Sequence, residues 1–166
     1  MIATDQFAHV DYLWDEKKAA ELEGDEVALF LYRSNILGAD LRITNFGGGN
    51  TSCKTIEKDP LTEEEVEVMW VKGSGGDIGT LTRSGIAGLY THRLRELKNV
   101  YRGLEHEDEM VGLLYHCLYD LDSRAPSIDT PLHGLLPFTH IDHLHPDALI
   151  AVAAAEAAVG LAILIS

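Results

Sequence analysis

Apolar residues recur along the chain at spacings that predict three internal helices. The first helix rests on apolar residues at helical spacing: Val27, Phe30, Leu31 and Leu37. Asp25 and Glu26 suit its first turn, and Gly38 is positioned to end it in a left-handed conformation. A second helix would present one apolar face made of Ile86, Leu89, Tyr90, Leu94 and Leu97. A third, behind an acidic start at residues 107–109, would present Met110, Val111, Leu114, Cys117 and Leu118.

Other segments have the pattern of strands. Val66, Val68 and Trp70 occupy every second position, which is typical of a strand. Residues 41–46 and 51–56 flank Gly47–Gly49 and are predicted as a hairpin. Residues 138–145 form a further predicted strand. With helices and strands mixed along the sequence, and no internal repeat, the chain is predicted to be a single α/β unit.

The last apolar run covers residues 148–165 and is interrupted by Glu156 and Gly160. Its length is close to that of a membrane span, but a carboxylate near the middle of such a span is costly in lipid. This segment is therefore predicted to be a buried helix, and no membrane partner is expected.

Composition narrows the classes of function. The 166 residues are sufficient for one domain with a substantial core, and 46% of them are hydrophobic. The formal net charge of −14 argues against binding to nucleic acid or to anionic membranes. Cys53 and Cys117 form no disulfide framework, and the amino terminus has no secretion signal. We therefore expect a cytoplasmic protein with reduced thiols.

A cluster of imidazoles and carboxylates between residues 126 and 146 carries the most specific chemistry. His143 and His145 lie two residues apart, so a strand would place both side chains on one face, where they can converge on one metal ion. The alternative is the polar face of a half-exposed strand. Asp129 in a turn-rich loop can be a helix cap, or, beside a metal, a ligand or proton carrier. His133 and His140 are expected to be bystanders.

Two glycine-rich segments, residues 47–52 and 73–76, are candidate anion-binding loops. Glycine lets backbone amides approach an anion closely, and the neighbouring serine, threonine and asparagine side chains add donors. Neither segment completes a P-loop or a dinucleotide-binding motif, and each by itself is typical of a turn.

Together these motifs resemble a known family. The ordered segments Asn45–Ser52, Val71–Asp77, Pro126–His133 and His143–Pro146 are similar to those of class II aldolase/adducin-type domains. The resemblance runs from Trp14 to Ala153 and is strongest to the aldolase part of bifunctional rhamnulose-1-phosphate aldolase/alcohol dehydrogenases. It implies three α/β/α layers around a mainly antiparallel sheet, assembly as a homotetramer, and a divalent metal, expected to be Zn²⁺.

The resemblance also implies an activity, the cleavage of a ketose 1-phosphate such as rhamnulose 1-phosphate to dihydroxyacetone phosphate and an aldehyde. The residues implied to hold the substrate phosphate are Asn50, Ser52, Ser74, Gly75 and Ser127. His143 and His145 would bind the metal, and Asp129, where many relatives have glutamate, would move the proton.

The chain departs from the family pattern at one point. The third metal-binding histidine of the family lies downstream of the pair, and no histidine follows His145 here. No dehydrogenase segment is present either. Residues 1–166 are therefore expected to be the amino-terminal portion of a class II aldolase-like domain. The alternatives are a sugar-phosphate 4-epimerase of the same superfamily, a noncatalytic adducin-like interaction module, or an inactive truncated product.

Overall fold

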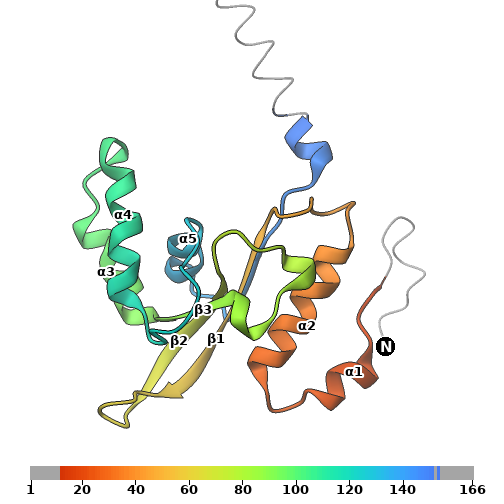
Figure 1. Ribbon diagram of the computed structural model, residues 1–166, viewed down its shortest axis with the longest axis horizontal. Helices are drawn as coiled ribbons and strands as arrows, with labels where there is room; N and C mark the ends of the chain where they lie inside the picture. The colour runs from red at the N-terminus through yellow and green to blue at the C-terminus, as the bar shows by residue number, and fades with distance from the viewer. Residues whose placement is uncertain (1–11, 152, 154–166) are drawn as a thin grey trace, which may run out of the picture.

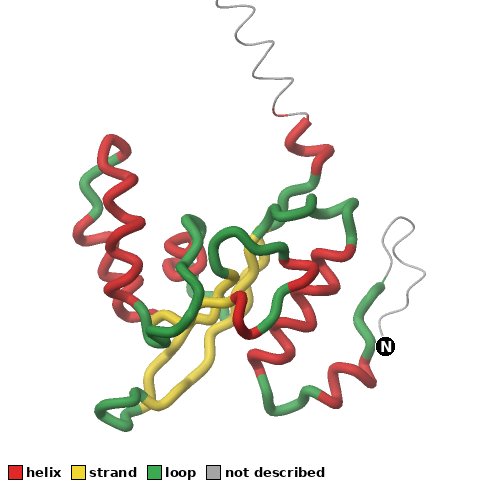
Figure 2. The backbone as a smooth tube through the Cα atoms, in the orientation of Figure 1, coloured by secondary structure: helices red, strands yellow, loops and turns green. Residues whose placement is uncertain are grey.

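The computed structural model describes residues 12–151 and 153 and places its helices on both sides of one sheet (Figures 1 and 2). The helices are α1 (Glu16–Glu21), α2 (Glu26–Ala39), α3 (Thr91–Val100), α4 (Glu107–Leu114) and α5 (Thr130–Leu135). The strands are β1 (Asn50–Lys58), β2 (Glu65–Lys72), β3 (Ile86–Tyr90) and β4 (His140–His143). Short 3-10 turns are η2 (Ile78–Thr80), η3 (Arg83–Gly85), η4 (Leu104–His106) and η5 (Tyr115–Cys117).

All strand pairs of the sheet are antiparallel, in the order β3-β2-β1-β4. Ser52 of β1 pairs with Val71 of β2, and Asn50 pairs with His143 of β4. Antiparallel pairing thus brings the start of β1, the end of β2 and the end of β4 to the same end of the sheet. The candidate site is built there.

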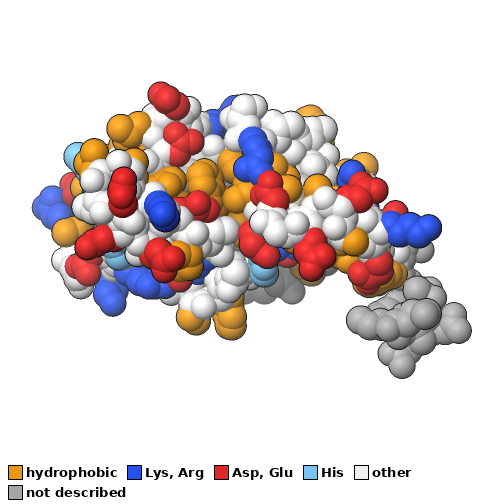
Figure 3. All heavy atoms as spheres, turned by 90° about the horizontal axis from the view of Figure 1, so that it is seen from below, with side chains coloured by type: hydrophobic (Ala, Val, Ile, Leu, Met, Phe, Trp, Pro, Cys, Tyr) orange, Lys and Arg blue, Asp and Glu red, His pale blue; other side chains and the backbone are white. Residues whose placement is uncertain are grey.

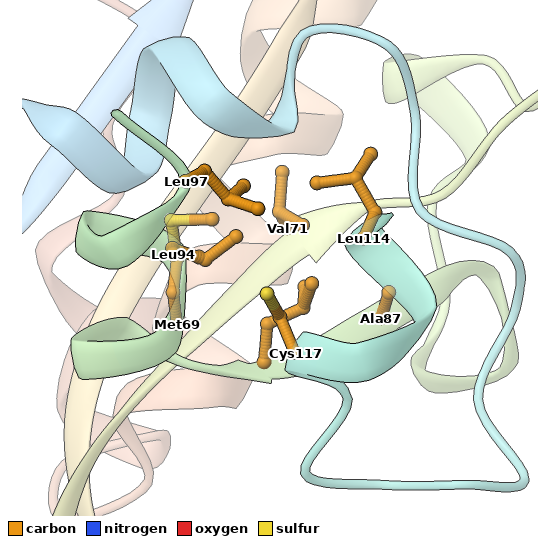
Figure 4. Packing of buried hydrophobic residues seen from close by; sticks show 8 residues of the cluster. Met69, Val71, Ala87, Leu94, Leu97, Leu114 and Cys117 are labelled. Atoms are coloured by element: carbon orange, nitrogen blue, oxygen red, sulfur yellow. The ribbon is translucent and has the colours of Figure 1, made fainter. Parts of the chain in front are cut away.

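Each face of the sheet is covered by a hydrophobic core. One core packs the sheet against α3, α4 and η5 and consists of Met69, Val71, Ala87, Leu89, Leu94, Leu97, Leu114 and Cys117 (Figure 4). The other packs it against α2 and consists of Val27, Phe30, Cys53, Leu81 and Ile86. Figure 1 shows α2 on one side of the sheet and α3, α4 and α5 on the other. The expected α/β class, with α/β/α layers and an antiparallel sheet, is confirmed.

The predicted strand at residues 41–46 is wrong. These residues form turns, organised by Asp40, whose carboxylate accepts from the Arg42 amide at 3.0 Å and from its guanidinium at 2.8 Å. Leu41 and Phe46 are 66% and 83% exposed, so this apolar pattern does not face the core. Strand β1 pairs instead with β2 and β4.

The predicted helix over residues 86–97 is wrong in its first half. Ile86–Tyr90 is strand β3, all five of its residues are buried, and helix α3 begins at Thr91. A short strand covered on both faces reads as a continuous apolar run, and its periodicity does not distinguish it from a buried helix. Leu94 and Leu97 are buried on a helix as predicted.

Gly38 does not end α2 in a left-handed conformation, as the sequence suggested. It lies inside the helix, which extends to Ala39 and is followed by Asp40 as its C-cap. A Cβ atom at position 38 would lie 2.0 Å from the Gly79 nitrogen. The glycine therefore permits close contact between α2 and η2, and the two backbones touch where no side chain fits.

The carboxyl-terminal prediction is only partly within the described residues. The predicted strand at 138–145 is present as the shorter β4, and a helix begins at residue 147. Residue 152 and residues 154–166 of the predicted buried helix lie outside the described residues. Of the helices that the structure describes, none is long and apolar enough to cross a membrane.

Candidate functional site

Three strand ends meet around the side chain of Asn50, the first residue of β1. Its amide nitrogen donates a hydrogen bond to the Ser127 hydroxyl, and lies 3.4 Å from the carbonyl oxygen of Lys72, the last residue of β2. Asn50 is fully buried and pairs across the ladder with His143. It therefore joins β1, β2, β4 and the loop before α5 at one point.

His143 and His145 face each other beside this point. Their Nε2 atoms are 3.1 Å apart, and the ring centroids are 4.6 Å apart. Two imidazole nitrogens bound at about 2.05 Å to one tetrahedral zinc ion would be roughly 3.3 Å apart. The backbone amide of Asn45 donates a hydrogen bond to the backbone carbonyl of His145 at 3.1 Å. This contact holds the second histidine against the glycine-rich loop. The pair therefore fits two ligand positions of one ion.

Asp129 lies near Nδ1, the other ring nitrogen of His143. Its Oδ1 is 3.8 Å from His143 Nδ1, which is buried and has no hydrogen-bond partner within the described residues. Asp129 stands at the N-cap of α5 but makes no side-chain cap hydrogen bond. Its carboxylate is therefore free to orient the His143 imidazole, as carboxylates beside metal-binding histidines do.

The metal site is incomplete in the described part of the chain. Within residues 12–151 and 153, no group of three or more His, Cys, Asp or Glu side chains is arranged to hold a metal ion. Catalytic zinc sites usually take three protein ligands. His143 and His145 would thus supply two donors of a candidate metal site, and Asp129 lies beside His143.

The glycine-rich loop after β2 lies against the segment before α5. Gly73 forms a bridge with Pro126, and the Ser74 amide donates to the Ala125 carbonyl at 2.9 Å. Ser74 is exposed, so its hydroxyl is accessible to a ligand. Gly75 has φ +71°, a conformation that favours glycine, and it sits at the exposed tip of the loop. Ser74 and Gly75 thereby lie beside the segment that carries Ser127.

The carboxylate of Asp77 connects the two glycine-rich loops. Its Oδ1 accepts from the Gly47 amide at 2.8 Å, and its Oδ2 accepts from the Gly79 amide at 2.9 Å. Asp77 therefore holds the loop that precedes Asn50 beside the loop that follows Lys72.

Ser52 lies deeper than the other predicted phosphate-binding residues. It is fully buried on β1, and its Oγ is 2.7 Å from Nδ1 of His133, which is fully buried on α5. Burial lowers the pKa of His133 to about 4. The structure thus brings together Asn50, Ser74, Gly75, Ser127, Asp129, His143 and His145, whereas the hydroxyl of Ser52 is directed toward α5.

Sequence reasoning missed Lys72. Its side chain is 5% exposed, and within the described residues its ammonium forms no ion pair or hydrogen bond. Burial lowers the pKa of Lys72, against the opposing influence of Asp129 and Asp77. The available signal was a lysine that directly follows the apolar run 68–71 and directly precedes a glycine-rich loop. A largely buried cation next to Asn50, under the electrostatic influence of Asp129 and Asp77, is a candidate counter-charge for an anionic substrate.

Two surface grooves flank these elements. A groove of about 540 Å³ between α3, α4 and α5 is lined mostly by apolar side chains and also by Asp129. A groove of about 820 Å³ along β1 and β4 contains none of the candidate site residues. Acidic side chains are scattered over the face drawn in Figure 3, in keeping with the net charge of −14.

Comparison with known proteins assigns the family. Residues 31–163 match the family described as Class II Aldolase and Adducin N-terminal domain. This chain belongs to that family. The class II aldolase domain is 28% identical to the N-terminal class II aldolase domain of a conserved Thermoplasma acidophilum protein. The structures superpose with a TM-score of 0.74, covering 86% of this chain and 63% of that one.

A longer relative is also known. The class II aldolase domain is 45% identical over 147 residues to the "Uncharacterized oxidoreductase YuxG" of Bacillus subtilis (strain 168). The alignment covers 89% of this chain but only 21% of that protein, so the chain spans about a fifth of the length of this curated relative. Class II aldolases generally depend on a divalent metal. The 3.1 Å separation of the two histidine nitrogens is compatible with that dependence.

Proposed function

We propose that this domain is the amino-terminal portion of a metal-dependent aldolase that cleaves a ketose 1-phosphate. The products would be dihydroxyacetone phosphate and an aldehyde, and rhamnulose 1-phosphate is the first substrate to test. The observation that carries the proposal is the convergence of His143 and His145 beside Asn50, at the end of the sheet where Lys72 is buried. A two-imidazole donor set and a cationic, amide-rich pocket suit a metal and a phosphate respectively.

The chain's own residues would divide the work of binding and proton transfer. Lys72 would balance the phosphate charge, and the side chains of Asn50, Ser74 and Ser127 would donate hydrogen bonds to its oxygens. Held there, the phosphate would fix the position of the reacting carbons. His143 and His145 would hold the metal, which when bound supplies Lewis-acid stabilisation for the enediolate charge that develops in retro-aldol cleavage.

Asp129 would serve two purposes in this arrangement. Its carboxylate orients His143 through Nδ1, at a distance of 3.8 Å. It is also about one-third exposed, so it can reach the substrate and take the proton of the hydroxyl group next to the bond that breaks. Because aspartate is one methylene shorter than glutamate, the substrate must sit close to the start of α5.

The Bacillus relative supports a bifunctional parent protein. That protein is named an oxidoreductase, and the chain covers 21% of it. We therefore propose that the complete protein joins the aldolase domain to a dehydrogenase, which acts on the aldehyde product.

The test is release of dihydroxyacetone phosphate from rhamnulose 1-phosphate by the complete protein. His143→Ala and His145→Ala should each lower kcat/KM by about 100-fold or more and reduce the bound metal. His140→Ala, on the same strand and exposed, is the matched control and should leave both unchanged. Full activity in His143→Ala and His145→Ala proteins that no longer bind metal would overturn the proposal.

The alternatives give different products in the same assay. A sugar-phosphate 4-epimerase would interconvert two phosphorylated sugars without releasing dihydroxyacetone phosphate. A noncatalytic adducin-like module would turn over no sugar phosphate and would be insensitive to the loss of His143 and His145. Chromatography of the sugar phosphates together with metal analysis distinguishes these three functions.

A further inference from the structure

We infer that the hydrogen bond between Ser52 and His133 is a positioning contact, which fixes Asp129 by holding α5 against β1, and that Ser52 does not contact the substrate phosphate. The expected effect on catalysis rests on the proposed function. The expected effects on phosphate binding and on the position of Asp129 do not depend on it. Both residues change role relative to the sequence analysis, which placed Ser52 at the phosphate and treated His133 as a bystander.

The contact joins two elements that are remote in sequence. Ser52 and His133 are separated by 81 positions, both are fully buried, and Ser52 Oγ lies 2.7 Å from His133 Nδ1. Within the described residues, the Ser52 hydroxyl has no other hydrogen bond. A phosphate could reach this hydroxyl only if the contact were broken and α5 moved away from the sheet.

Helix α5 transmits this contact to Asp129. The helix has only six residues, and Asp129 is its N-cap. The His133 amide lies 3.4 Å from the Asp129 carbonyl oxygen, so both residues belong to the same helical turn. Because the Asp129 carboxylate makes no cap hydrogen bond, the position of α5 decides where it points. In the structure, the Asp129 carboxylate is directed toward His143, with Oδ1 3.8 Å from Nδ1.

The other contacts of α5 hold its far side and its end. Gly134 packs against Leu94 of α3, where a Cβ atom would lie 2.9 Å from the leucine side chain. Lys54 donates hydrogen bonds to the carbonyl oxygens of Leu136 and Phe138, at 2.5 and 2.7 Å. Both contacts lie beyond His133 along the chain. Two β1 residues therefore hold the segment around Asp129: Asn50 binds Ser127, two residues before it, and Ser52 binds His133 on the helix itself.

The state of His133 suits a structural role. Its burial keeps the imidazole neutral at the pH of an ordinary assay, because its pKa is lowered to about 4. Its Nε2 atom is buried without a hydrogen-bond partner in the described residues. His133 acts through its contact with Ser52 and does not touch the reacting atoms.

The experiment compares Ser52→Ala with Ser127→Ala in the purified protein, using inorganic phosphate as the probe. We expect Ser52→Ala to leave phosphate affinity within about twofold of the wild type and to lower kcat by about 10- to 100-fold, the cost of misplacing a catalytic group. Ser127→Ala should weaken phosphate binding by about tenfold. A loss of phosphate affinity in Ser52→Ala equal to that in Ser127→Ala would make Ser52 a phosphate ligand and overturn the inference.

Variants of His133 test the same contact from the other side. The amide nitrogen of asparagine can occupy the place of Nδ1, so His133→Asn should retain most of kcat, whereas His133→Leu should lose as much as Ser52→Ala. The double variant Ser52→Ala/His133→Leu should be no worse than either single variant. Additive losses in the double variant would contradict a shared contact.

A structural readout makes the inference independent of aldolase activity. The ring ¹⁵N shifts of His143 report its contact with Asp129. We expect Ser52→Ala to move these shifts toward their values in Asp129→Asn, and Lys54→Met, which frees only the end of α5, to leave them in place. Unchanged shifts in a folded Ser52→Ala protein would overturn the positioning role. Absence of aldolase activity in the wild type, with the shifts displaced as expected, would reject the proposed function alone.

Discussion

At the scale of single residues, the two ring nitrogens of His143 have different neighbours. Nε2 of His143 faces His145 at 3.1 Å, and Nδ1 faces Asp129 at 3.8 Å. In the proposed function, a hydrogen bond from Nδ1 to this carboxylate, formed by closing the present 3.8 Å separation, would favour the tautomer whose Nε2 lone pair is available to a metal. The exposed fraction of the His143 side chain, 34%, leaves the ring accessible to a ligand. Orientation and access are therefore combined in one side chain.

Lys72 gives a prediction at this scale. Replacing it with methionine, which has a similar length and no charge, should raise KM for the phosphorylated substrate by about 10- to 100-fold, since a hydrogen bond to a charged group contributes roughly 1.5–3 kcal/mol. Steady-state kinetics of Lys72→Met measures this. Lys58→Met, at the exposed far end of β1, is the control and should behave as the wild type.

The same substitution should stabilise the fold. Burial lowers the pKa of Lys72, so folding disfavours its protonated form. At pH 7 the unfolded chain carries the charge without penalty, and removal of the ammonium group should therefore raise the free energy of unfolding. Urea denaturation at pH 7 compares the two proteins. A less stable Lys72→Met protein would show that the ammonium has a stabilising partner.

At the scale of elements, the site depends on close contacts between loops and helices. Helix α2 touches η2 through Gly38 and Gly79, and the Asp77 carboxylate, two residues before Gly79, binds the Gly47 amide. The packing of one helix thereby determines where both glycine-rich loops lie. Local sequence patterns carry little information about such contacts, because either glycine by itself is typical of a turn.

Gly38→Ala tests this contact. The added Cβ would lie 2.0 Å from a backbone nitrogen, which cannot move as a flexible side chain can, so the free energy of unfolding should fall by about 1–3 kcal/mol. Gly112→Ala, in helix α4, is the matched control. No atom lies within 4 Å of its new Cβ, and helix propensity should raise stability by about 0.5–1 kcal/mol. Urea denaturation of both variants measures the difference, and equal effects would contradict a close contact at Gly38.

At the scale of the whole molecule, we propose that the domain works as part of a larger protein. The chain covers 21% of its Bacillus relative, and the described residues provide two imidazoles at the candidate metal site. Two ligands hold zinc less firmly than the three usual in catalytic sites. Segments of the complete protein outside these residues would then supply the remaining donor.

Zinc affinity, compared between the 166-residue chain and the complete protein, tests whether a donor outside the described residues completes the site. The 166-residue chain should bind Zn²⁺ at least about 100-fold more weakly than the complete protein, by competition with a chromogenic chelator. The remaining binding should disappear in His143→Ala/His145→Ala and persist in His92→Ala, a variant on the exposed face of α3. Equal affinity in the two lengths of chain would mean that residues within the chain complete the site.

Much of the organisation was predictable because it is local. Helix α2 and strand β2 followed from spacing and alternation. The segments that carry the family resemblance were recognisable in order, and the match over residues 31–163 supports them. The proximity of His143 and His145 also follows from their spacing of two on an extended segment, since alternate side chains share a face.

The sequence by itself determined the family, the α/β class and the paired histidines, because each depends on residues close together along the chain. Only the tertiary structure decided that Ile86–Tyr90 is a strand, that Lys72 is buried at the site and that Ser52 faces His133. These features depend on which surfaces become covered and on partners as far apart as 81 positions. Local patterns carry little of that information, because burial and long-range hydrogen bonds arise only when the layers pack.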